Sequence, residues 1–444
     1  MSKHERRCRL VERTLAIAFT STLAGSCSRA EPARPGTSSS RDSAGVQIVE
    51  SRAPAWSAAQ TWTVLDTPSV SIGAEDRGPQ YTLTNVRGVA ELSDGRIAIA
   101  NAGTFEIRCY RSDGSFLWAS GQRGQGPGDY STITSLARYR GDSLLVFDFG
   151  LRRYSVIDPS GRFARSWIPA LPADFTFSGS LSFAGAWDDG SIAIVAQPVR
   201  RGMSPPQVTR RSAQLLKYSP TGEVLASLGA FPGTEYYEGL GNPGSIRPLP
   251  FARSVQFAPA VHHTFVGITD TYEIRRLRGD GQVDQLIRRE LPVRPITPAQ
   301  VAAERDRLRR ARNEERPRLF RGMPDSILRV LIAGEEKTFD VLPFPPSYPA
   351  YSNIVVGRDG YLWVREFTHD VNADSTGSSW SIFYPDGRWL GDIRLPTRFT
   401  MYEATAEHVI GVQTDELGLQ FVRVFQLQKG GIRGGQRLQL VAGR

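Results

Sequence analysis

Alternating apolar and polar positions recur along most of the chain, in pairs of short runs joined by a glycine turn. A period of two residues indicates β-strands, and glycine reaches the positive φ that tight hairpin turns require. Five segments have this form: 105–120, 154–167, 214–229, 272–287 and 380–393. Their turn glycines are Gly114, Gly161, Gly222, Gly281 and Gly387. The pattern predicts five β-hairpins of similar design.

A second hairpin precedes most of these, and its second strand is a short, fully apolar run. These additional segments are 90–101, 137–148, 186–196, 355–366 and 403–413. Two hairpins make a four-stranded antiparallel sheet, and radial repetition of such sheets is typical of a β-propeller. The sequence therefore predicts an all-β fold, a six-bladed β-propeller of four-stranded antiparallel blades. The expected blades are 86–120, 134–167, 182–228, 255–289, 351–394 and 402–428.

The segment 61–72 has the character of an outermost strand, although no blade precedes it in sequence. The simplest interpretation is that it completes the last blade and closes the ring, which leaves fewer exposed sheet edges. The alternative is that Arg437–Ala442 supplies that strand.

A helical and proline-rich insert at 291–350 is expected between blades 4 and 5. Thr297 followed by Pro298 is a favourable helix start, and the helix should run to about Glu315. A second, short helix is expected at Asp325–Leu331.

The first 27 residues have the features of a secretory signal peptide: a basic head, an uncharged run and small residues before Cys27. Leu23–Cys27 resembles a bacterial lipobox, which predicts lipidation of Cys27, whereas the alternative is plain cleavage near Ala30. Residues 28–58 are expected to form a flexible tether, because their Ser, Pro, Ala and Gly content favours disorder. The propeller is then 59–444. These features predict an exported protein, either a periplasmic or outer-membrane-attached lipoprotein or otherwise a secreted one.

The chain carries 54 basic and 45 acidic residues, a formal net charge of +9. Part of this excess is local, because 301–321 contains eight arginines and four acidic residues. An exported protein rarely meets nucleic acid, so nucleic-acid binding is not expected. The insert could instead offer a basic face to an acidic partner, anionic lipid or polysaccharide, or form a solvated helix with internal ion pairs. The candidate partner surface is Arg305, Arg309, Arg312 and Arg316.

The stretches at 92–101, 124–130 and 359–364 resemble those of the six-bladed β-propeller proteins of bacterial envelopes, within the broader NHL-repeat and TolB-like propeller superfamily. The resemblance covers about residues 60–428. It implies the propeller fold and export, and it implies little about activity.

Three polar residues end the second strands of their blades and should gather near one mouth of the central channel. They are Asn101, Asp148 and Glu366. Such oxygen ligands suit Ca²⁺ or Mg²⁺, and the resemblance to calcium-dependent lactonases of the gluconolactonase type points to a similar residue set. The competing interpretation is that these side chains pair within the protein. No HExxH or GxSxG motif occurs.

The expected function is therefore that of a binding module, without a required cofactor, for an envelope protein, peptide or glycan. The protein is expected to be a monomer held to the membrane by its lipid anchor. The alternative is a Ca²⁺- or Mg²⁺-dependent, lactonase-like hydrolase that uses Asn101, Asp148 and Glu366.

Overall fold

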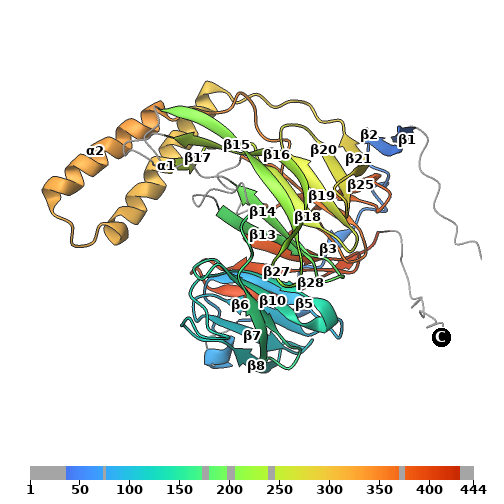
Figure 1. Cartoon of the computed structure of the whole chain (residues 1–444). Helices are drawn as coiled ribbons and strands as arrows, with labels where there is room; N and C mark the ends of the chain where they lie inside the picture. Colours follow the sequence, from blue (N-terminus) through green and yellow to red (C-terminus); the bar gives the residue numbers. More distant parts are fainter. Residues whose placement is uncertain are drawn as a thin grey trace, which may run out of the picture.

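The computed structural model describes residues 37–73, 77–172, 180–197, 206–238, 246–369 and 376–430. Its strands form six sheets arranged as the blades of a propeller, and two helices extend from one side (Figure 1). The innermost strands contact one another in cyclic order around the ring. The chain is a six-bladed β-propeller, as the hairpin pattern predicts. Neither α-helix of the described ranges has the length and hydrophobicity of a membrane-spanning segment.

The blades are numbered here from Val86. Blade 1 contains β5 (Val86–Glu91), β6 (Ile97–Asn101), β7 (Glu106–Tyr110) and β8 (Phe116–Ser120). Blade 2 contains β9 (Ile133–Arg138), β10 (Leu144–Asp148), β11 (Arg153–Ile157) and β12 (Phe163–Trp167). Blade 3 contains β13 (Ser180–Ala186), β14 (Ile192–Gln197), β15 (Gln207–Tyr218), β16 (Val224–Glu238) and the short β17 (Ile246–Pro248).

Blade 4 contains β18 (Val255–Pro259), β19 (His263–Ile268), β20 (Glu273–Arg278) and β21 (Val283–Arg289). Blade 5 contains β22 (Tyr351–Val356), β23 (Leu362–Glu366), β24 (Ser379–Phe383) and β25 (Trp389–Arg394). Blade 6 contains β26 (Phe399–Ala404), β27 (His408–Thr414) and β28 (Gln420–Gln428), completed by β3 (Thr63–Val64) and β4 (Val70–Ile72).

The five turn glycines that mark the hairpins all have a positive φ, between +84° and +94°. An L side chain is strained in this region, so glycine is the residue that these turns need. The observation confirms the hairpins predicted from the glycine spacing.

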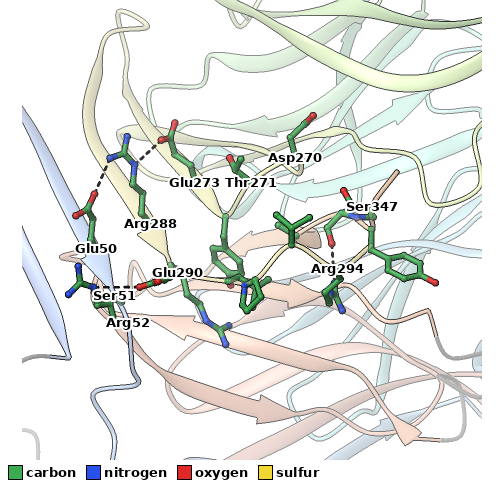
Figure 2. A pocket seen from close by; sticks show the side chains of 18 residues that line it. Glu50, Ser51, Arg52, Asp270, Thr271, Glu273, Arg288, Glu290, Arg294 and Ser347 are labelled. Atoms are coloured by element: carbon green, nitrogen blue, oxygen red, sulfur yellow. Dashed lines mark hydrogen bonds and ion pairs between the residues drawn. The ribbon is translucent and has the colours of Figure 1, made fainter. Parts of the chain in front are cut away.

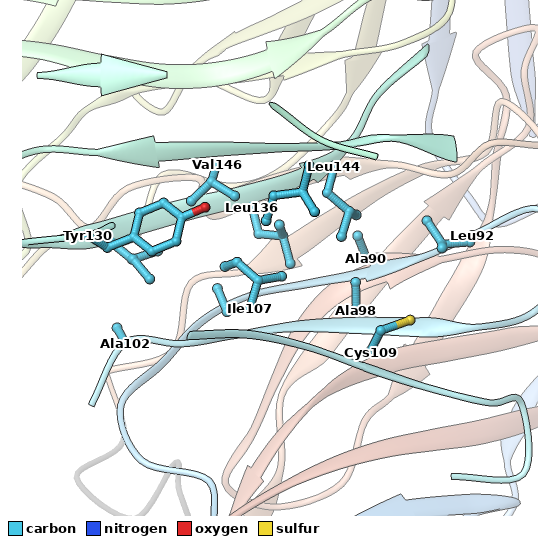
Figure 3. Packing of buried hydrophobic residues seen from close by; sticks show 13 residues of the cluster. Ala90, Leu92, Ala98, Ala102, Ile107, Cys109, Tyr130, Leu136, Leu144 and Val146 are labelled. Carbon is cyan, nitrogen blue, oxygen red and sulfur yellow. The ribbon is translucent and has the colours of Figure 1, made fainter. Parts of the chain in front are cut away.

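The core is divided into interblade clusters, each built by the facing sides of two neighbouring blades. Figure 3 shows the cluster between blades 1 and 2, where Cys109 and Ala98 lie close together beneath the second blade. Cys109 is fully buried, and burial raises the pKa of its thiol to about 11. The thiol therefore acts as a small apolar group.

The N-terminal strands close the ring. β4 pairs with β28, with Ile72 opposite Val422, and both side chains are fully buried in the cluster between blades 6 and 1. This confirms that 61–72 completes the last blade. The alternative strand, Arg437–Ala442, lies outside the described residues.

The prediction of a flexible tether over 28–58 is wrong for Ser38–Ser51. β1 (Ser38–Ser43) and β2 (Val46–Ser51) form a hairpin, and β2 pairs in parallel with β21 at the outer edge of blade 4. Buried Gln285 links the two strands, because its Nε2 donates to Gln47 Oε1 at 2.9 Å. Backbone pairing with a preformed edge stabilises a segment whose composition alone favours disorder. Residues 28–36 lie outside the described part of the chain.

The insert lies between blades 4 and 5 as numbered here, or between the fifth and sixth if the blade containing β3 and β4 is counted first. It consists of α1 (Pro298–Leu319) and α2 (Asp325–Val341). Thr297 caps α1 in a reciprocal capping box with Gln300, as its position before Pro298 suggests. Both helices are longer than expected, because Pro317 falls in the last turn of α1 and α2 continues past Leu331.

Candidate functional site

A pocket of about 510 Å³ lies where three separate segments meet: the β1–β2 hairpin, the outer part of blade 4 and the approach to blade 5. The segment 290–294 after β21 forms one wall, and 347–350 before β22 forms another. Val293 projects from the first wall with 77% of its surface exposed. The two walls carry apolar residues such as Leu291, Pro292 and Pro349, and charged side chains line the rest of the pocket. Ligand sites commonly combine apolar walls with a few polar groups in this way.

The carboxylates of the rim are held in ion pairs (Figure 2). Arg288 lies between Glu50 and Glu273, at 3.0 and 2.9 Å, and Arg52 lies 3.5 Å from Glu290. The side-chain hydrogen bond from Arg288 lowers the pKa of Glu50, and the positive charge of Arg288 acts in the same direction. These carboxylates are all engaged in ion pairs, so they favour recognition of a ligand over general acid–base chemistry.

At the other end of the pocket, the carboxylate of Asp270 is also paired with an arginine. Asp270 receives two hydrogen bonds from Arg210, at 2.7 and 2.6 Å, from outside the pocket. Its pKa is lowered because the hydrogen bonds and charge of Arg210, assisted by Arg253, outweigh the effect of burial. Arg294 donates to the carbonyl oxygens of Phe367 and Pro349, both at 3.0 Å.

An aromatic cluster adjoins the pocket at the base of the insert. Phe251, which has a positive φ of 57°, contacts Phe344, Tyr348 and Phe367 with ring-centroid distances of 5.0–6.0 Å. His369 joins the same cluster, 5.4 Å from Phe251. Tyr348 also lines the pocket, so this cluster fixes the wall at 347–350.

Glu366, one of the three candidate metal ligands, lies in a polar network between blades 4 and 5. Arg289 donates to Glu366 at 2.6 Å and to Ser381 at 2.5 Å, and Ser381 donates to Asp392 at 2.7 Å. The Arg289 guanidinium also stacks 3.7 Å from the ring centroid of Trp389. The contacts of Glu366 are therefore those of an interblade ion pair.

Asn101 and Asp148, the other two candidates, are fully buried and bind backbone. Asn101 Oδ1 accepts from the Thr84 N–H at 2.7 Å. Asp148 accepts from the N–H groups of Ser131, Thr132 and Leu151, at 2.6–3.1 Å. Across the described residues, no group of three or more His, Cys, Asp or Glu side chains could hold a metal ion. The metal site stays a prediction, because no observation in the described chain supports it.

A cluster that sequence reasoning missed lies at the opposite mouth of the channel, where the innermost strands end. Arg358 lies 2.7 Å from Glu403 and 3.9 Å from Glu91, and His408 Nε2 lies 3.1 Å from Glu91 Oε2. Burial raises the pKa of Glu403. Burial acts in the same direction on Glu91, yet the hydrogen bond from His408 and the nearby positive charges leave its pKa lowered.

Glu91 and Glu403 occupy equivalent positions near the ends of β5 and β26. This equivalence is visible in the sequence and could have predicted that the two carboxylates lie near each other. His408 follows Glu403 closely in sequence but lies 317 positions from Glu91, so its contact with Glu91 depends on the closure of the ring.

The four arginines of the candidate partner surface on α1 make contacts within the insert. Arg309, Arg312 and Arg316 face α2 and pair with its acidic residues, at 2.5–3.3 Å for the pairs Arg309–Asp340, Arg309–Glu336 and Arg316–Glu335. Arg312 also binds Glu335, and Arg305 donates to the Leu342 carbonyl at 3.2 Å. These four arginines join α1 to the rest of the insert, and their role as a partner surface stays a prediction. Cys27, the candidate lipidation site, lies outside the described residues.

Comparison with known proteins finds remote structural similarity. No family model and no curated protein matches the chain. A candidate exported protein of Bacteroides fragilis is 9% identical, with 86% of this chain and 99% of that chain covered at a TM-score of 0.47. A member of the DUF4221 family from Bacteroides vulgatus is 12% identical, with 83% and 99% covered at 0.45. A gluconolactonase from Xanthomonas campestris is 14% identical, with 83% and 98% covered at 0.36. Identities and TM-scores this low carry no argument.

Proposed function

We propose that this chain is an exported, lipid-anchored β-propeller that binds a protein, peptide or glycan partner of the cell envelope. The observation that carries the proposal is the pocket between the β1–β2 hairpin, blade 4 and the start of blade 5. Its lining includes four arginines balanced by four acidic residues, so it suits a partner without a large net charge. The lining charges are Glu50, Arg52, Asp270, Glu273, Arg288, Arg289, Glu290 and Arg294.

A rigid ring that presents a pocket formed by its connecting segments is the usual arrangement for recognition by a propeller. The ion pairs of the rim fix the side chains before a partner arrives, which lowers the entropy lost on binding. The alternative of a Ca²⁺- or Mg²⁺-dependent hydrolase has no observation in its favour among the described residues.

The experiment is site-specific photo-crosslinking in cells with the photoreactive residue at Val293, which is exposed in the pocket. Leu417, which is 86% exposed in blade 6, is the matched control position. A defined adduct is expected from Val293 and not from Leu417. Thr271→Trp, which fills the pocket from an exposed position, should abolish the adduct while the circular dichroism spectrum is unchanged. Identical adducts from both positions, or adducts that survive Thr271→Trp, would contradict the proposal.

The anchor has its own test. Cys27→Ser should move the protein from the membrane fraction to the soluble fraction after a high-salt wash, because acyl chains resist salt and electrostatic contacts do not. Unchanged fractionation of the variant would reject lipidation at Cys27.

A further inference from the structure

The paired helices α1 and α2 form an arm with a basic and apolar end, and we propose that this end docks on an anionic membrane surface. The arm tip is defined as Arg318, Phe320, Arg321, Met323, Ile327, Arg329 and Val330. Asp325 is the single acidic residue between positions 318 and 330. The proposal does not depend on the pocket or on its partner.

The positive charges of the arm fall into two classes. The arginines on the inner side of α1 are neutralised by Glu335, Glu336 and Asp340 of α2. By contrast, Arg318, Arg321 and Arg329 are exposed and have no carboxylate within 4.0 Å in the described chain. Arg329 makes only a long contact of 3.4 Å to the backbone oxygen of Asp325. Arg310 and Lys337, elsewhere on the arm, are also exposed with no carboxylate within 4.0 Å among the described residues, so the tip holds three of these five unpaired positive charges.

Apolar side chains accompany these charges. Ile327 is 51% exposed and Val330 is 72% exposed, and their spacing of three residues places them on the same face of α2. Single exposed aliphatic residues are ordinary on protein surfaces. Two of them in one helical turn, directly beside Arg329, form the combination that interfacial segments use to enter the headgroup region.

The position of the arm suits contact with a flat surface. Figure 1 shows α1 and α2 projecting outward from one side of the ring of blades. The base of the arm is held by a small core in which Leu342 packs with Tyr237 and Leu249, assisted by Leu308. Because the base is fixed and the helices are joined by ion pairs, the tip is presented at a constant place.

The observations favour a membrane over other occupants of the tip. A second copy of the arm would bring like charges together, which is unfavourable. An acidic protein surface would satisfy the arginines but would leave Ile327 and Val330 without apolar partners. Anionic lipid satisfies both groups, since each basic residue near such a surface strengthens binding about fivefold and the acyl boundary accepts the aliphatic side chains.

The test is co-sedimentation of the full chain carrying Cys27→Ser with vesicles of phosphatidylglycerol and phosphatidylcholine, and with vesicles of phosphatidylcholine alone. We expect binding to the anionic vesicles only. Arg318→Gln, Arg321→Gln and Arg329→Gln combined should weaken binding about a hundredfold, at about fivefold for each charge. Val330→Asp should weaken vesicle binding further, and because Val330 is exposed it should leave the fold of the unbound protein unchanged.

The matched control removes the same net charge elsewhere, with Arg111→Gln, Arg162→Gln and Arg278→Gln, which are exposed near the outer turns of three blades. This control should bind like the parent chain. Equal binding to both vesicle types, or equal losses in the tip and control variants, would overturn the proposal. A change in oligomeric state by light scattering, without vesicle binding, would overturn it in favour of contact between arms.

Discussion

Among individual residues, a substitution at Asp148 can distinguish a structural role of this carboxylate from a metal-binding role. Its buried carboxylate accepts from three backbone N–H groups, and Asp148→Ala leaves these donors without a partner. We expect a loss of about 3 kcal/mol in the free energy of unfolding, measured by urea denaturation. Asp280→Ala, at an exposed turn, should change it little. Calorimetric binding of Ca²⁺ to the parent chain that Asp148→Ala abolishes would instead support the metal site.

Glu403 carries a prediction about pH. Burial raises its pKa above the ordinary value of 4.5 in the folded protein, so the folded state binds this proton more tightly than the unfolded chain. That contribution to stability is present at low pH and is lost as the pH rises from about 4.5 through the folded-state pKa. Glu403→Gln should therefore gain stability relative to the parent chain between about pH 4 and pH 7, measured by chemical denaturation. The control is Glu416→Gln, because Glu416 is exposed. If the difference in unfolding free energy between Glu403→Gln and the parent chain were the same at pH 4 and at pH 7, the prediction would be contradicted.

Among the elements, the β1–β2 hairpin tests how the N-terminal segment is held. Val49 is 1% exposed beside β21, so Val49→Asp places an unpaired charge in an apolar contact. We expect the amides of 46–51 to exchange with solvent slowly in the parent chain and rapidly in the variant, by hydrogen-exchange mass spectrometry. Ser40→Asp, on the exposed strand β1, should leave exchange unchanged. Rapid exchange of 46–51 in the parent chain would restore the flexible tether.

The contrast between this hairpin and the five blade hairpins shows what the sequence can predict. Turn glycines and alternating strands are local signals, so the blades and the closing strand 61–72 could be placed without coordinates. The pairing of β2 with β21 joins residues more than 200 positions apart, and no local pattern in Ser38–Ser51 predicts this pairing. The same limit applies to function: Glu366 and Arg309 have the residue type for a site, but their partners decide their roles.

At the scale of the whole molecule, the interblade clusters form a closed series. Each blade is apolar on both faces and packs against two neighbours, and the cluster between blades 6 and 1 includes Ile72 from the N-terminal strand. A propeller opened at this point would expose two apolar faces at once. Closure by β4 therefore couples the two ends of the described chain to the stability of every blade.

This coupling gives a prediction for the ring. Ile72→Ala should lower the free energy of unfolding by about 3 kcal/mol, because a fully buried side chain is lost. Leu65→Ala, 42% exposed in the same segment, should have little effect. Since Ile72 lies opposite Val422, the double variant with Val422→Ala should lose less than the sum of the single losses. Calorimetry should show one cooperative transition at a lower Tm. An early, separate transition confined to blade 6 would mean that the closing strand stabilises only its own blade.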